Sequence, residues 1–417
     1  MHVQLASAFE GTSFGKEASD ILGKCVHCGF CTATCPTYQL LGDELDGPRG
    51  RIYLVKQLLE TKEASKVTRV HLDRCLTCRS CETTCPSDVH YGRLVELARP
   101  VVDELCPRPV LERLGRWSLV HLMLGPWFGL LLRIGQTLRG LLPKSLARHI
   151  PKRYHAGIVP RSQGNRRVLM LDGCVQPAMA PQINAAARRV LAKLDVDARS
   201  AKQAGCCGAL QLHLGDTDPA LDAMRRNIDA WWPEIENGVE AIVMTASGCG
   251  VTVREYGQLL KNDPVYFEKA KRVSELTVDL SEFISPEDVA SLGAMSPRRV
   301  AFHSPCTLQH GQGIRGKVER ILKTAGADLV STHNSHLCCG AAGTYSVLQS
   351  ELSIRLLDQK ISDLNQDAPE LIVTANLGCL AQLASSSPVP VRHWIELIDP
   401  SAPVSYTHLT LPTKRIV

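Results

Sequence analysis

The sequence predicts an α-helical N-terminal domain followed by two duplicated α/β units, an architecture that joins the α+β and α/β classes. Two copies of one short cysteine loop lie within the first 100 residues, and the segment between them has the apolar periodicity of a helix. Farther along the chain, a set of cysteines recurs at an offset of 132 residues, which indicates an internal duplication. Each copy has the order strand, helix, helix and strand, a pattern typical of a parallel sheet covered by helices.

The two cysteine loops share the spacing C-x2-C-x2-C-x3-C-P, from Cys25 to Pro36 and from Cys75 to Pro86. Bacterial ferredoxins bind [4Fe-4S] cubanes with this run, in which three thiolates ligate one cluster and the fourth ligates its neighbour. We therefore expect two clusters whose fourth ligands are exchanged between the loops. The predicted ligands are Cys25, Cys28, Cys31 and Cys85 for cluster 1, and Cys75, Cys78, Cys81 and Cys35 for cluster 2.

Zinc sites and disulfides fit the two loops less well. A zinc site would use paired C-x2-C knuckles with four ligands in total, which leaves the third and fourth cysteines of each loop without a role. A disulfide framework is not expected, because the 17 cysteines are odd in number, the chain is long, and residues 1–20 lack the basic start and apolar run of a signal peptide. A chain with this many cysteines and no export signal is expected to keep its thiols reduced, as a cytoplasmic, metal-binding protein does.

The predicted two-cluster ferredoxin domain spans residues 1–105 and consists of helices around the two loops. A helical lead-in ends near residue 24, and a second helix covers residues 50–60. A third helix covers residues 94–105, where Pro100 is expected to kink or break it. Cys106 has no partner at motif spacing and is expected to be a buried structural thiol.

Positive charge is concentrated in the segment that follows. Residues 107–167 contain twelve Lys or Arg and only Glu112 as an acid, whereas the whole chain carries a net charge of +5. The apolar stretch 117–132 lies inside this segment, is shorter than the roughly 20 residues of a membrane span, and is interrupted by Pro126. Three roles stay open for this linker, residues 106–165: a helical segment packed on the ferredoxin domain, contact with an anionic membrane surface, or docking of partner subunits.

The duplicated part is expected to form two domains, here named the first and second CCG domains (residues 166–280 and 298–399) after their Cys-Cys-Gly turns, with residues 281–297 as the linker between them. Strands are predicted at 168–171, 241–245, 300–302 and 371–374, and helices at 183–194 and 314–325. Each domain offers four cysteines at strand ends or turns, enough to hold a further iron-sulfur cluster or a redox site, although a purely structural role is the alternative. These cysteines are Cys174, Cys206, Cys207 and Cys249 in the first domain, and Cys306, Cys338, Cys339 and Cys379 in the second.

Four histidines lie near the cysteines of the second CCG domain: His303, His310, His333 and His336. None of them has a histidine at the matching position of the first domain. Leu171 corresponds to His303, and Ala204 corresponds to His336. We expect these side chains to be hydrogen-bonding neighbours of the cysteines rather than ligands.

The sequence predicts no flavin or nicotinamide site. Residues 311–316 match G-x-G-x-x-G, but they begin nine residues after the predicted strand, and no acidic strand end follows at the required distance. There is also no P-loop and no nucleophile with its base, so no catalytic residue is assigned. The chain is expected to carry electrons rather than to perform hydride chemistry, with neither FAD nor NAD and with no nucleic-acid partner.

With both cysteine systems described, the chain resembles the family that contains the iron-sulfur subunits of glycolate oxidase, the C subunit of anaerobic glycerol-3-phosphate dehydrogenase and the B/D-type subunits of heterodisulfide reductase. Its similarity to the glycolate oxidase iron-sulfur subunits extends over nearly the whole chain. The similar stretches are CVHCGFCTATCPTYQLLGDELDGPRGRIYL (25–54), HLDRCLTC (71–78), NIDAWWP (227–233), TASGCG (245–250), SHLCCGAAGTY (335–345) and RHWIE (392–396).

This resemblance implies an electron-transfer subunit of a glycolate oxidase or dehydrogenase. Such a subunit accepts electrons from an FAD-containing partner that oxidises glycolate to glyoxylate, and passes them toward a quinone or another membrane acceptor. The resemblance also implies a location on the cytoplasmic face of the inner membrane. The alternative is a subunit like those of heterodisulfide reductase or glycerol-3-phosphate dehydrogenase, with thiol or cluster chemistry in the CCG domains.

Two features depart from the family pattern. Full CCG motifs end in C-x2-C, whereas Ala246 and Asn376 occupy the first of these positions here, so each domain has four cysteines rather than five. The sequence therefore leaves open whether the CCG domains hold clusters. The tail, residues 400–417, has neither periodicity nor resemblance to the family and is expected to be disordered; whether it is native to the gene also stays open.

Overall fold

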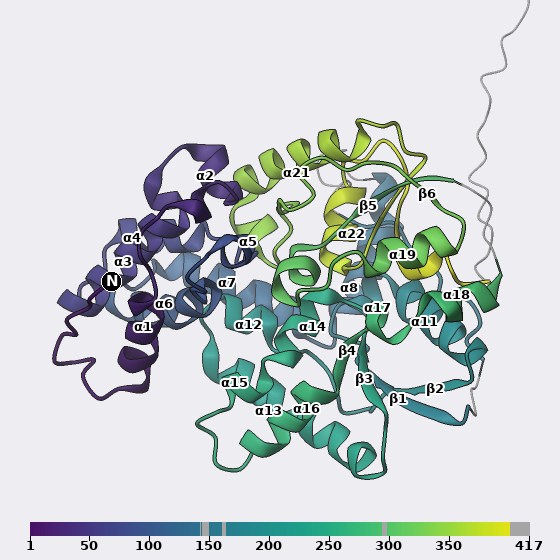
Figure 1. Ribbon diagram of the computed structural model, residues 1–417, viewed down its shortest axis with the longest axis horizontal. Coiled ribbons are helices and arrows are strands. Elements are labelled where there is room, and N and C mark those ends of the chain that lie inside the picture. The colour runs from purple at the N-terminus through teal and green to yellow at the C-terminus, as the bar shows by residue number, and fades with distance from the viewer. Residues whose placement is uncertain (142, 144–149, 161–163, 294–297, 401–417) are drawn as a thin grey trace, which may run out of the picture.

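The computed structural model describes residues 1–141, 143, 150–160, 164–293 and 298–400 (Figure 1). The helical N-terminal domain lies at one end of the molecule and the two α/β units lie at the other. This arrangement confirms the predicted fold class. Of the tail that the sequence predicts to be disordered, only Pro400 belongs to the described residues.

The helices of the N-terminal domain bury their apolar faces in one core. They are α1 (Ser13–Gly23), α2 (Pro36–Leu41), α3 (Pro48–Thr61), α4 (Lys66–Asp73), α5 (Ser80–Thr84) and α6 (Tyr91–Leu105). The predicted lead-in is confirmed as α1, which buries Ala18, Ile21 and Leu22. The second predicted helix is confirmed as α3, whose Leu58 and Leu59 belong to the same apolar cluster.

Helix α6 continues through Pro100, where the sequence predicts a kink or a break. A proline inside a helix removes a backbone hydrogen bond and costs about 3 kcal/mol. Leu94 and Val95 before the proline and Val102 after it are all buried in the domain core. Burying such a side chain gains about 1.5–3 kcal/mol. Packing on both sides of Pro100 therefore keeps the helix continuous, so of the two predicted outcomes the break is absent.

Cys106 ends α6 and is only partly buried, so the prediction of a buried thiol was wrong. Its carbonyl oxygen accepts a hydrogen bond from Arg69 Nη1 at 2.7 Å, and its Sγ lies 3.7 Å from the same nitrogen. A residue at the end of a helix on the domain boundary is covered on one side only, which explains the partial exposure.

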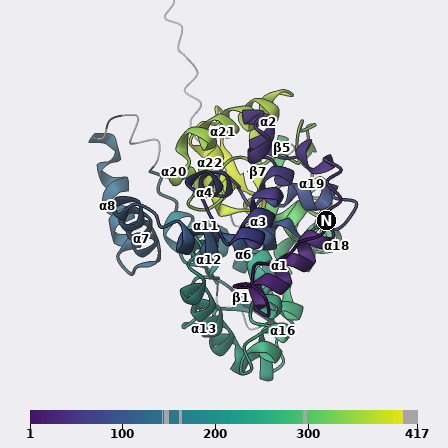
Figure 2. The same ribbon diagram turned by 90° about the vertical axis from the view of Figure 1, so that its left-hand side faces the viewer.

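The basic linker forms two helices, α7 (Val110–Leu124) and α8 (Phe128–Leu138), that project from the side of the molecule (Figure 2). Arg108 Nη2 anchors the start of the linker by its ion pair with Asp73 Oδ1 at 2.8 Å. Among the described residues no single helix is long and apolar enough to cross a membrane, whereas α7 and α8 together satisfy length and composition but are bent by 92°. Exposed apolar side chains on the two helices are Val110, Leu111, Leu114, Trp117, Leu122, Leu130, Leu131, Ile134 and Leu138.

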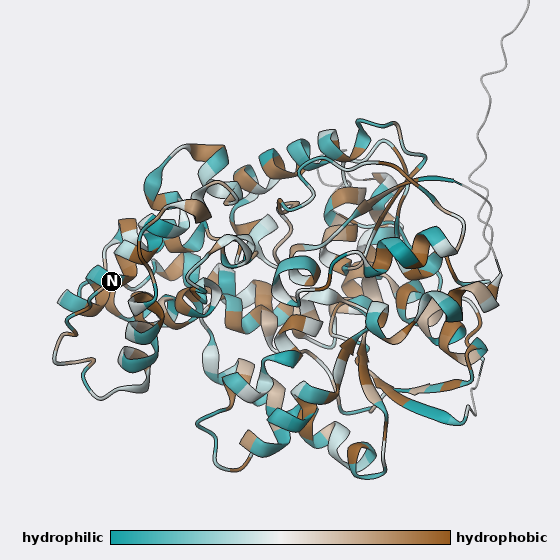
Figure 3. Ribbon diagram, in the orientation of Figure 1, coloured by the Kyte–Doolittle hydropathy of each residue, from teal (hydrophilic) through white to brown (hydrophobic). Residues whose placement is uncertain are grey.

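Each CCG domain contains a four-stranded parallel sheet with the same topology, in the order β2-β1-β3-β4 and β6-β5-β7-β8. The strands are β1 (Arg166–Met170), β2 (Val196–Arg199), β3 (Ala241–Met244) and β4 (Thr277–Asp279), then β5 (Arg299–His303), β6 (Asp328–Leu329), β7 (Leu371–Thr374) and β8 (Val391–His393). The predicted strands are the central ones, and β3 and β7 are fully buried; β3 is coloured as hydrophobic in Figure 3. The edge strands were not predicted, because they have two to four residues and lack the uninterrupted apolar run of β3 and β7.

Helices pack against both sheets. In the first CCG domain they are α10 (Gln176–Met179), α11 (Pro181–Lys193), α12 (Ala209–His213), α13 (Thr217–Glu236), α14 (Ser247–Arg254), α15 (Tyr256–Leu259) and α16 (Phe267–Leu276). In the second they are α19 (Lys317–Thr324), α20 (Tyr345–Leu348), α21 (Ser350–Asn365) and α22 (Leu377–Ala384). The predicted helices are thus present, although α19 begins three residues later than expected.

The two CCG domains share one apolar core. The segment predicted as a linker between them, residues 281–297, contributes to it through α17 (Leu280–Phe283) and α18 (Pro286–Leu292), while residues 294–297 lie outside the described part. Val289 of α18 belongs to the same buried cluster as Val168 of the first sheet and Val300 of the second. The two sheets are therefore held together by burial and not only by their connection.

A buried carboxylate fixes the segment between the two cysteine loops. Asp46 is fully buried, and its Oδ2 lies 2.8 Å from Arg74 Nη1. Its Oδ1 lies 2.9 Å from His71 Nδ1 and 3.4 Å from Arg51 Nη2. The carbonyl oxygen of Asp46 accepts a hydrogen bond from Thr37 Oγ1 at 2.8 Å, at the start of α2. One residue thus connects the end of the first loop with the helix that leads into the second.

Replacing Asp46 with Asn is expected to lower the free energy of unfolding by about 3–5 kcal/mol, because the buried Arg51 loses its counter-charge. The measurement is the first transition in urea-induced unfolding followed by circular dichroism. Asp88→Asn is the matched control, since Asp88 is 78% exposed and its pair with Lys24 is a surface contact that should contribute less than about 1 kcal/mol. Equal losses in the two variants would contradict the structural role of Asp46.

Candidate metal centres

The two ferredoxin loops have the same backbone conformation. His27 and Gly29 in the first loop have positive φ angles of 56° and 84°, and Thr77 and Arg79 at the matching places have 51° and 59°. These left-handed residues turn the chain between successive cysteines and direct amide groups inward; Thr77 N donates to Cys75 Sγ at 3.4 Å. Hydrogen bonds to cysteine sulfurs stabilise thiolates and set cluster potentials.

The structure brings the predicted ligands of cluster 2 together. One small cavity is lined by Cys35, Cys75, Cys78 and Cys81. Cys35 reaches this cavity from the first loop, as an exchange of ligands requires, and its Sγ lies 3.3 Å from Thr37 Oγ1. Burial raises the pKa of Cys78 and Cys81 well above the usual range. Such thiols become thiolates when a bound cation compensates their charge, and the donor set fits an iron-sulfur cubane.

The predicted ligands of cluster 1 also lie near one another, closer to the surface. Burial raises the pKa of Cys31 to about 11, with smaller contributions from its neighbours Cys25, Cys85 and Cys28. Cys28 is exposed, whereas three of the four cysteines around the other cavity are buried. The first loop is therefore the accessible one of the two.

The second CCG domain packs directly on the second loop. The contact is an apolar cluster that contains Leu76, Cys338, Tyr345, Leu352 and Leu356, with Cys78 and Cys306 packed against it. Tyr345 Oη donates to Arg74 O at 3.2 Å, and Thr83 Oγ1 lies 2.8 Å from His310 Nδ1. The second loop therefore lies between the first loop and the cysteines of the second CCG domain. No pattern in the sequence indicated this contact.

In the first CCG domain, the four cysteines converge at the carboxyl ends of the strands. Cys174 follows β1, Cys206 and Cys207 form the turn before α12, and Cys249 lies in α14. Hydrogen bonds from Cys174 and Cys207 lower the pKa of Cys206, and Cys207 also contacts Cys249. Gly208, with a φ of 91°, is required in this turn, because a Cβ would lie 2.9 Å from a backbone oxygen of α13.

The second CCG domain repeats this arrangement. Cys306 Sγ lies 3.8 Å from Cys338 Sγ. Cys339 contacts both Cys338 and Cys379. The glycine of its turn, Gly340, is equally constrained, since a Cβ there would lie 2.7 Å from a backbone oxygen of α21. The structure thus gathers all eight cysteines into two groups of four, one in each domain.

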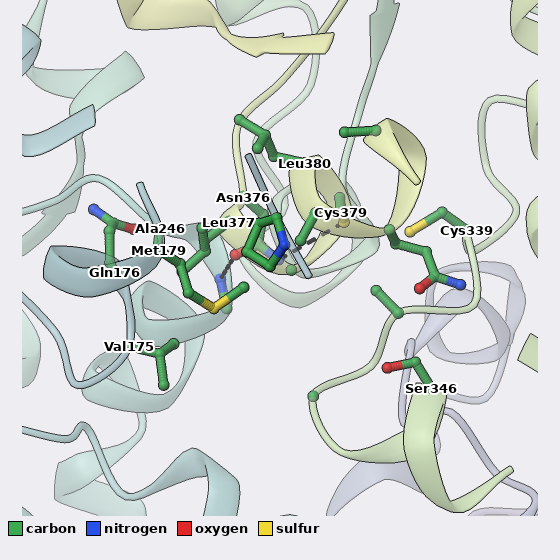
Figure 4. Close-up of a pocket in the computed structure, with 18 of the residues that line it drawn as sticks. Val175, Gln176, Met179, Ala246, Cys339, Ser346, Asn376, Leu377, Cys379 and Leu380 are labelled. Carbon is green, nitrogen blue, oxygen red and sulfur yellow. Dashed lines mark hydrogen bonds between the residues drawn. The ribbon is translucent and has the colours of Figure 1, made fainter. Parts of the chain in front are cut away.

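The two positions that depart from the full motif lie where the CCG domains meet (Figure 4). Asn376 Oδ1 accepts a hydrogen bond from Gly248 N at 3.2 Å, and its Nδ2 lies 3.7 Å from Cys379 Sγ. Ser247 N, next to Ala246, donates to Ala375 O at 3.2 Å. The side-chain amide of Asn376 therefore links the two domains beside Cys379. This link needs a strong donor and a strong acceptor, and a cysteine thiol at position 376 would supply neither.

A cavity of about 1630 Å³ opens between the CCG domains and the linker helices (Figure 4). Met179 of α10 and Leu377 and Leu380 of α22 lie along it (Figure 4). Its wall includes all eight CCG-domain cysteines and, from α7 and α8, Leu119, Leu122, Met123, Phe128 and Leu132. The cavity is large enough for an organic ligand and connects sulfur groups with apolar side chains.

One of the four predicted histidine neighbours joins a cysteine group. His303 is 2% exposed, and its ring lies with Cys339 and Cys379 in a set whose ligand atoms are all within 4.8 Å of one another. Burial lowers the pKa of His303 to about 3, so the ring is neutral. His310 instead contacts Thr83 and the carbonyl oxygen of His336, as a hydrogen-bonding neighbour does. Nothing in the sequence distinguished His303 from the other three, because the distance to the thiols depends on the fold.

A second compact group in the described residues, Asp43, Asp46 and His71, is a weaker candidate for a metal. Asp46 and His71 already pair with each other, and Arg74 and Arg51 supply positive charge to the same carboxylate. The negative charge that a cation would need is therefore neutralised by arginine.

Two protein families match the chain. The 4Fe-4S dicluster domain family matches residues 21–89, which contain both ferredoxin loops. The cysteine-rich domain family named CCG matches residues 168–254 and again residues 300–384. These matches confirm the duplication and the presence of iron-sulfur domains that the cysteine spacing predicts.

Several proteins are similar to the chain in sequence. The chain is 50% identical over 401 residues to the glycolate oxidase iron-sulfur subunit of Escherichia coli K12, and the match covers 96% of this chain and 98% of the relative. It is 30% identical to the probable glycolate oxidase iron-sulfur subunit of Bacillus subtilis, covering 86% and 87% of the two chains. Lactate utilization protein A of Bacillus licheniformis is 24% identical, and that match covers 56% of this chain and 99% of the relative.

A solved structure shares the fold. The crystal structure of a hypothetical protein from Helicobacter pylori matches with a TM-score of 0.52 at 11% identity, covering 93% of this chain and 72% of that one. At this identity the likeness concerns the fold alone.

Replacing Cys35 with Ser is expected to affect cluster 2 rather than cluster 1, if the fourth ligands are exchanged. The full-length protein should then lose about four of about eight ferredoxin irons, the content of one cubane. Iron analysis and EPR of the reduced protein measure this loss. Cys106→Ser, which lies outside both ligand sets, should keep its iron. A Cys35 variant that lost the same EPR signal as Cys28→Ser would assign Cys35 to its own loop.

Proposed function

The chain belongs to the family of glycolate oxidase iron-sulfur subunits, and from this premise we propose that it is the electron-transfer subunit of a glycolate-oxidising complex. An FAD-containing partner oxidises glycolate to glyoxylate, which releases two electrons and two protons, and this chain conducts the electrons away. The hydride chemistry belongs to the partner, since no flavin site is predicted in this chain. The observation that supports the proposal most directly is the packing of the buried second loop between the exposed first loop and the second CCG domain.

We assign the two clusters to the ferredoxin loops with exchanged fourth ligands. Cluster 1 takes Cys25, Cys28, Cys31 and Cys85, and cluster 2 takes Cys75, Cys78, Cys81 and Cys35. When bound, [4Fe-4S] clusters supply sites that take up and release one electron at a time. The chain's own contribution is to hold the thiolates, to direct amide and hydroxyl donors at them, as Thr77 N and Tyr91 Oη do for Cys75, and to exclude water from the second loop.

The first loop is the surface on which we place the flavin partner. Cys28 is exposed there, and the neighbouring apolar side chains Val26 and Phe30 are 68% and 61% exposed. Apolar residues at this exposure next to a redox site are typical of a surface that a partner covers. Docking at this surface brings the flavin close to the accessible ligand set.

A second part of the molecule, the cavity with α7 and α8, suits the acceptor. The cavity between the CCG domains joins cysteines to apolar side chains of α7 and α8, a combination that fits an apolar quinone ring approaching redox groups. The exposed apolar residues of α7 and α8, with Arg113 and Arg133 also exposed, fit the surface of an anionic membrane. Within this proposal the complex rests on the cytoplasmic face of the inner membrane, with α7 and α8 against the lipid.

The heterodisulfide-reductase-like and glycerol-3-phosphate-dehydrogenase-like alternatives are not favoured. The relatives that cover most of the chain are glycolate oxidase iron-sulfur subunits. Further clusters in the CCG domains are compatible with any of these functions, because each domain gathers four thiols.

Replacing Cys78 with Ser should reduce glycolate-dependent quinone reduction by the assembled complex to background, because one ligand of the enclosed set is lost. Reduction of an artificial dye directly by the flavin partner should remain. Both rates are measured on the purified complex, with Cys106→Ser as the control that keeps both. Equal loss of the two activities would show that the chain does more than conduct electrons.

Reversing the charge of two exposed arginines in the linker, with Arg113→Glu and Arg133→Glu together, is expected to weaken binding to anionic vesicles at least about tenfold. Each basic residue near an anionic surface contributes about 1 kcal/mol. Co-sedimentation with anionic and with zwitterionic vesicles measures the effect at several salt concentrations. Reversing Lys16 and Lys66, which are exposed outside the linker, is the matched control. Unchanged binding by the linker variant would remove the membrane role.

A further inference from the structure

The second CCG domain contains a buried imidazole that the first domain lacks. His303 is the last residue of β5, and Leu171 takes its place after β1. Its Nδ1 lies 3.1 Å from Thr374 Oγ1 on the neighbouring strand β7. Its Nε2 is buried and has no hydrogen-bond partner among the described residues. An unpaired nitrogen in a buried position destabilises the fold, so a group that compensates for it is expected nearby.

Two thiols lie beside that ring. The ligand atoms of His303, Cys339 and Cys379 are all within 4.8 Å of one another, and the three residues are buried. Cys339 also contacts Cys338, whose thiol is buried as well. Imidazole nitrogen and thiolate sulfur are the donors that zinc and iron accept together, with metal–ligand distances of about 2.0–2.3 Å. Donors this close to one another surround a single point, as one ion requires, whereas a cubane distributes its ligands over separate iron atoms.

We propose that the second CCG domain binds a single metal ion through His303, Cys339 and Cys379, with Cys338 completing a four-coordinate set. Thr374 Oγ1 accepts a hydrogen bond from Nδ1–H of His303. This bond keeps the ring proton on Nδ1 and directs the Nε2 lone pair to the ion. Metal-binding histidines are oriented by such second contacts in other proteins. The ion is one that takes imidazole and thiolate together, which is the shared chemistry of zinc and ferrous iron.

The two CCG domains then differ in chemistry although they share their topology. The first domain offers thiols alone, since the position of His303 is Leu171 there. Asn376 stands where the full motif has a cysteine, and its Nδ2 lies 3.7 Å from Cys379 Sγ. Because no cysteine is present at position 376, Cys379 is the ligand that this segment supplies to the ion. A mixed nitrogen and sulfur site in one domain and an all-sulfur group in the other is the expected result.

The test is metal analysis of the anaerobically purified full-length protein, with X-ray absorption at the zinc and iron edges. His303→Leu restores the residue of the first domain and should remove about one metal ion per chain, while the iron of the ferredoxin loops stays. If the ion is zinc, the zinc edge of the unaltered protein shows nitrogen and sulfur neighbours together. If it is iron, the iron content falls by about one atom per chain and the Mössbauer doublet of a high-spin ferrous ion disappears. Either result supports the proposal.

His336→Leu is the matched control, because this histidine precedes the same cysteine pair but lies outside the compact group; it should retain the ion. His303→Cys should keep the ion with sulfur neighbours only, which separates ligand loss from misfolding. The proposal is overturned if His303→Leu keeps its full metal content and spectrum, if it loses about four irons together, or if the unaltered protein shows no nitrogen-bound ion. None of these readouts depends on glycolate oxidation, so the result is independent of the proposed function.

Discussion

The position of Cys35, in a cavity lined by cysteines of the other loop, is the constraint on which the N-terminal domain depends. Cys35 belongs to the first loop by sequence but lines the cavity of the second. The chain between them must therefore fold back on itself: α2 begins directly after Cys35, and Asp46 ties the start of α2 to the helices that precede the second loop. A buried carboxylate with several cationic partners is costly to place in a core unless its geometry is fixed. Here that geometry sets the distance between the two loops.

The CCG domains depend on the same second loop. They share a strand order and a glycine-bearing turn, but they contact the N-terminal domain differently. The second domain presents an apolar cluster around Tyr345, whereas the first presents Glu255, whose Oε2 lies 2.9 Å from Arg79 Nη2. Arg79 occupies the place that glycine has in the first loop, with a φ of 59°. Its ion pair with Glu255 helps to hold this left-handed backbone conformation, which is energetically unfavourable for a residue with a Cβ.

Local chemistry could be predicted from the sequence, but long-range packing could not. Cysteine spacing predicted which thiols gather, and apolar runs predicted the central strands, because both signals lie within a few residues. Of the kink or break predicted at Pro100, the break is absent, since core packing on either side of the proline outweighs the local penalty. The edge strands, the contact of Tyr345 with the second loop and the place of His303 beside Cys379 all depend on segments far apart in the chain. A single sequence contains no signal for such pairs.

The unequal burial of the two loops has a consequence for biogenesis and for oxidative damage. The thiols of the second loop are closed in by the second CCG domain, so iron and sulfide have to be delivered there before the domains close on one another. The first loop, with Cys28 at the surface, stays open to late delivery and equally open to oxygen and peroxide. Oxidants therefore reach the first loop before the interior. A molecule damaged in this way is altered at its exposed first loop while its interior stays intact, and repair needs only the exposed site to be refilled.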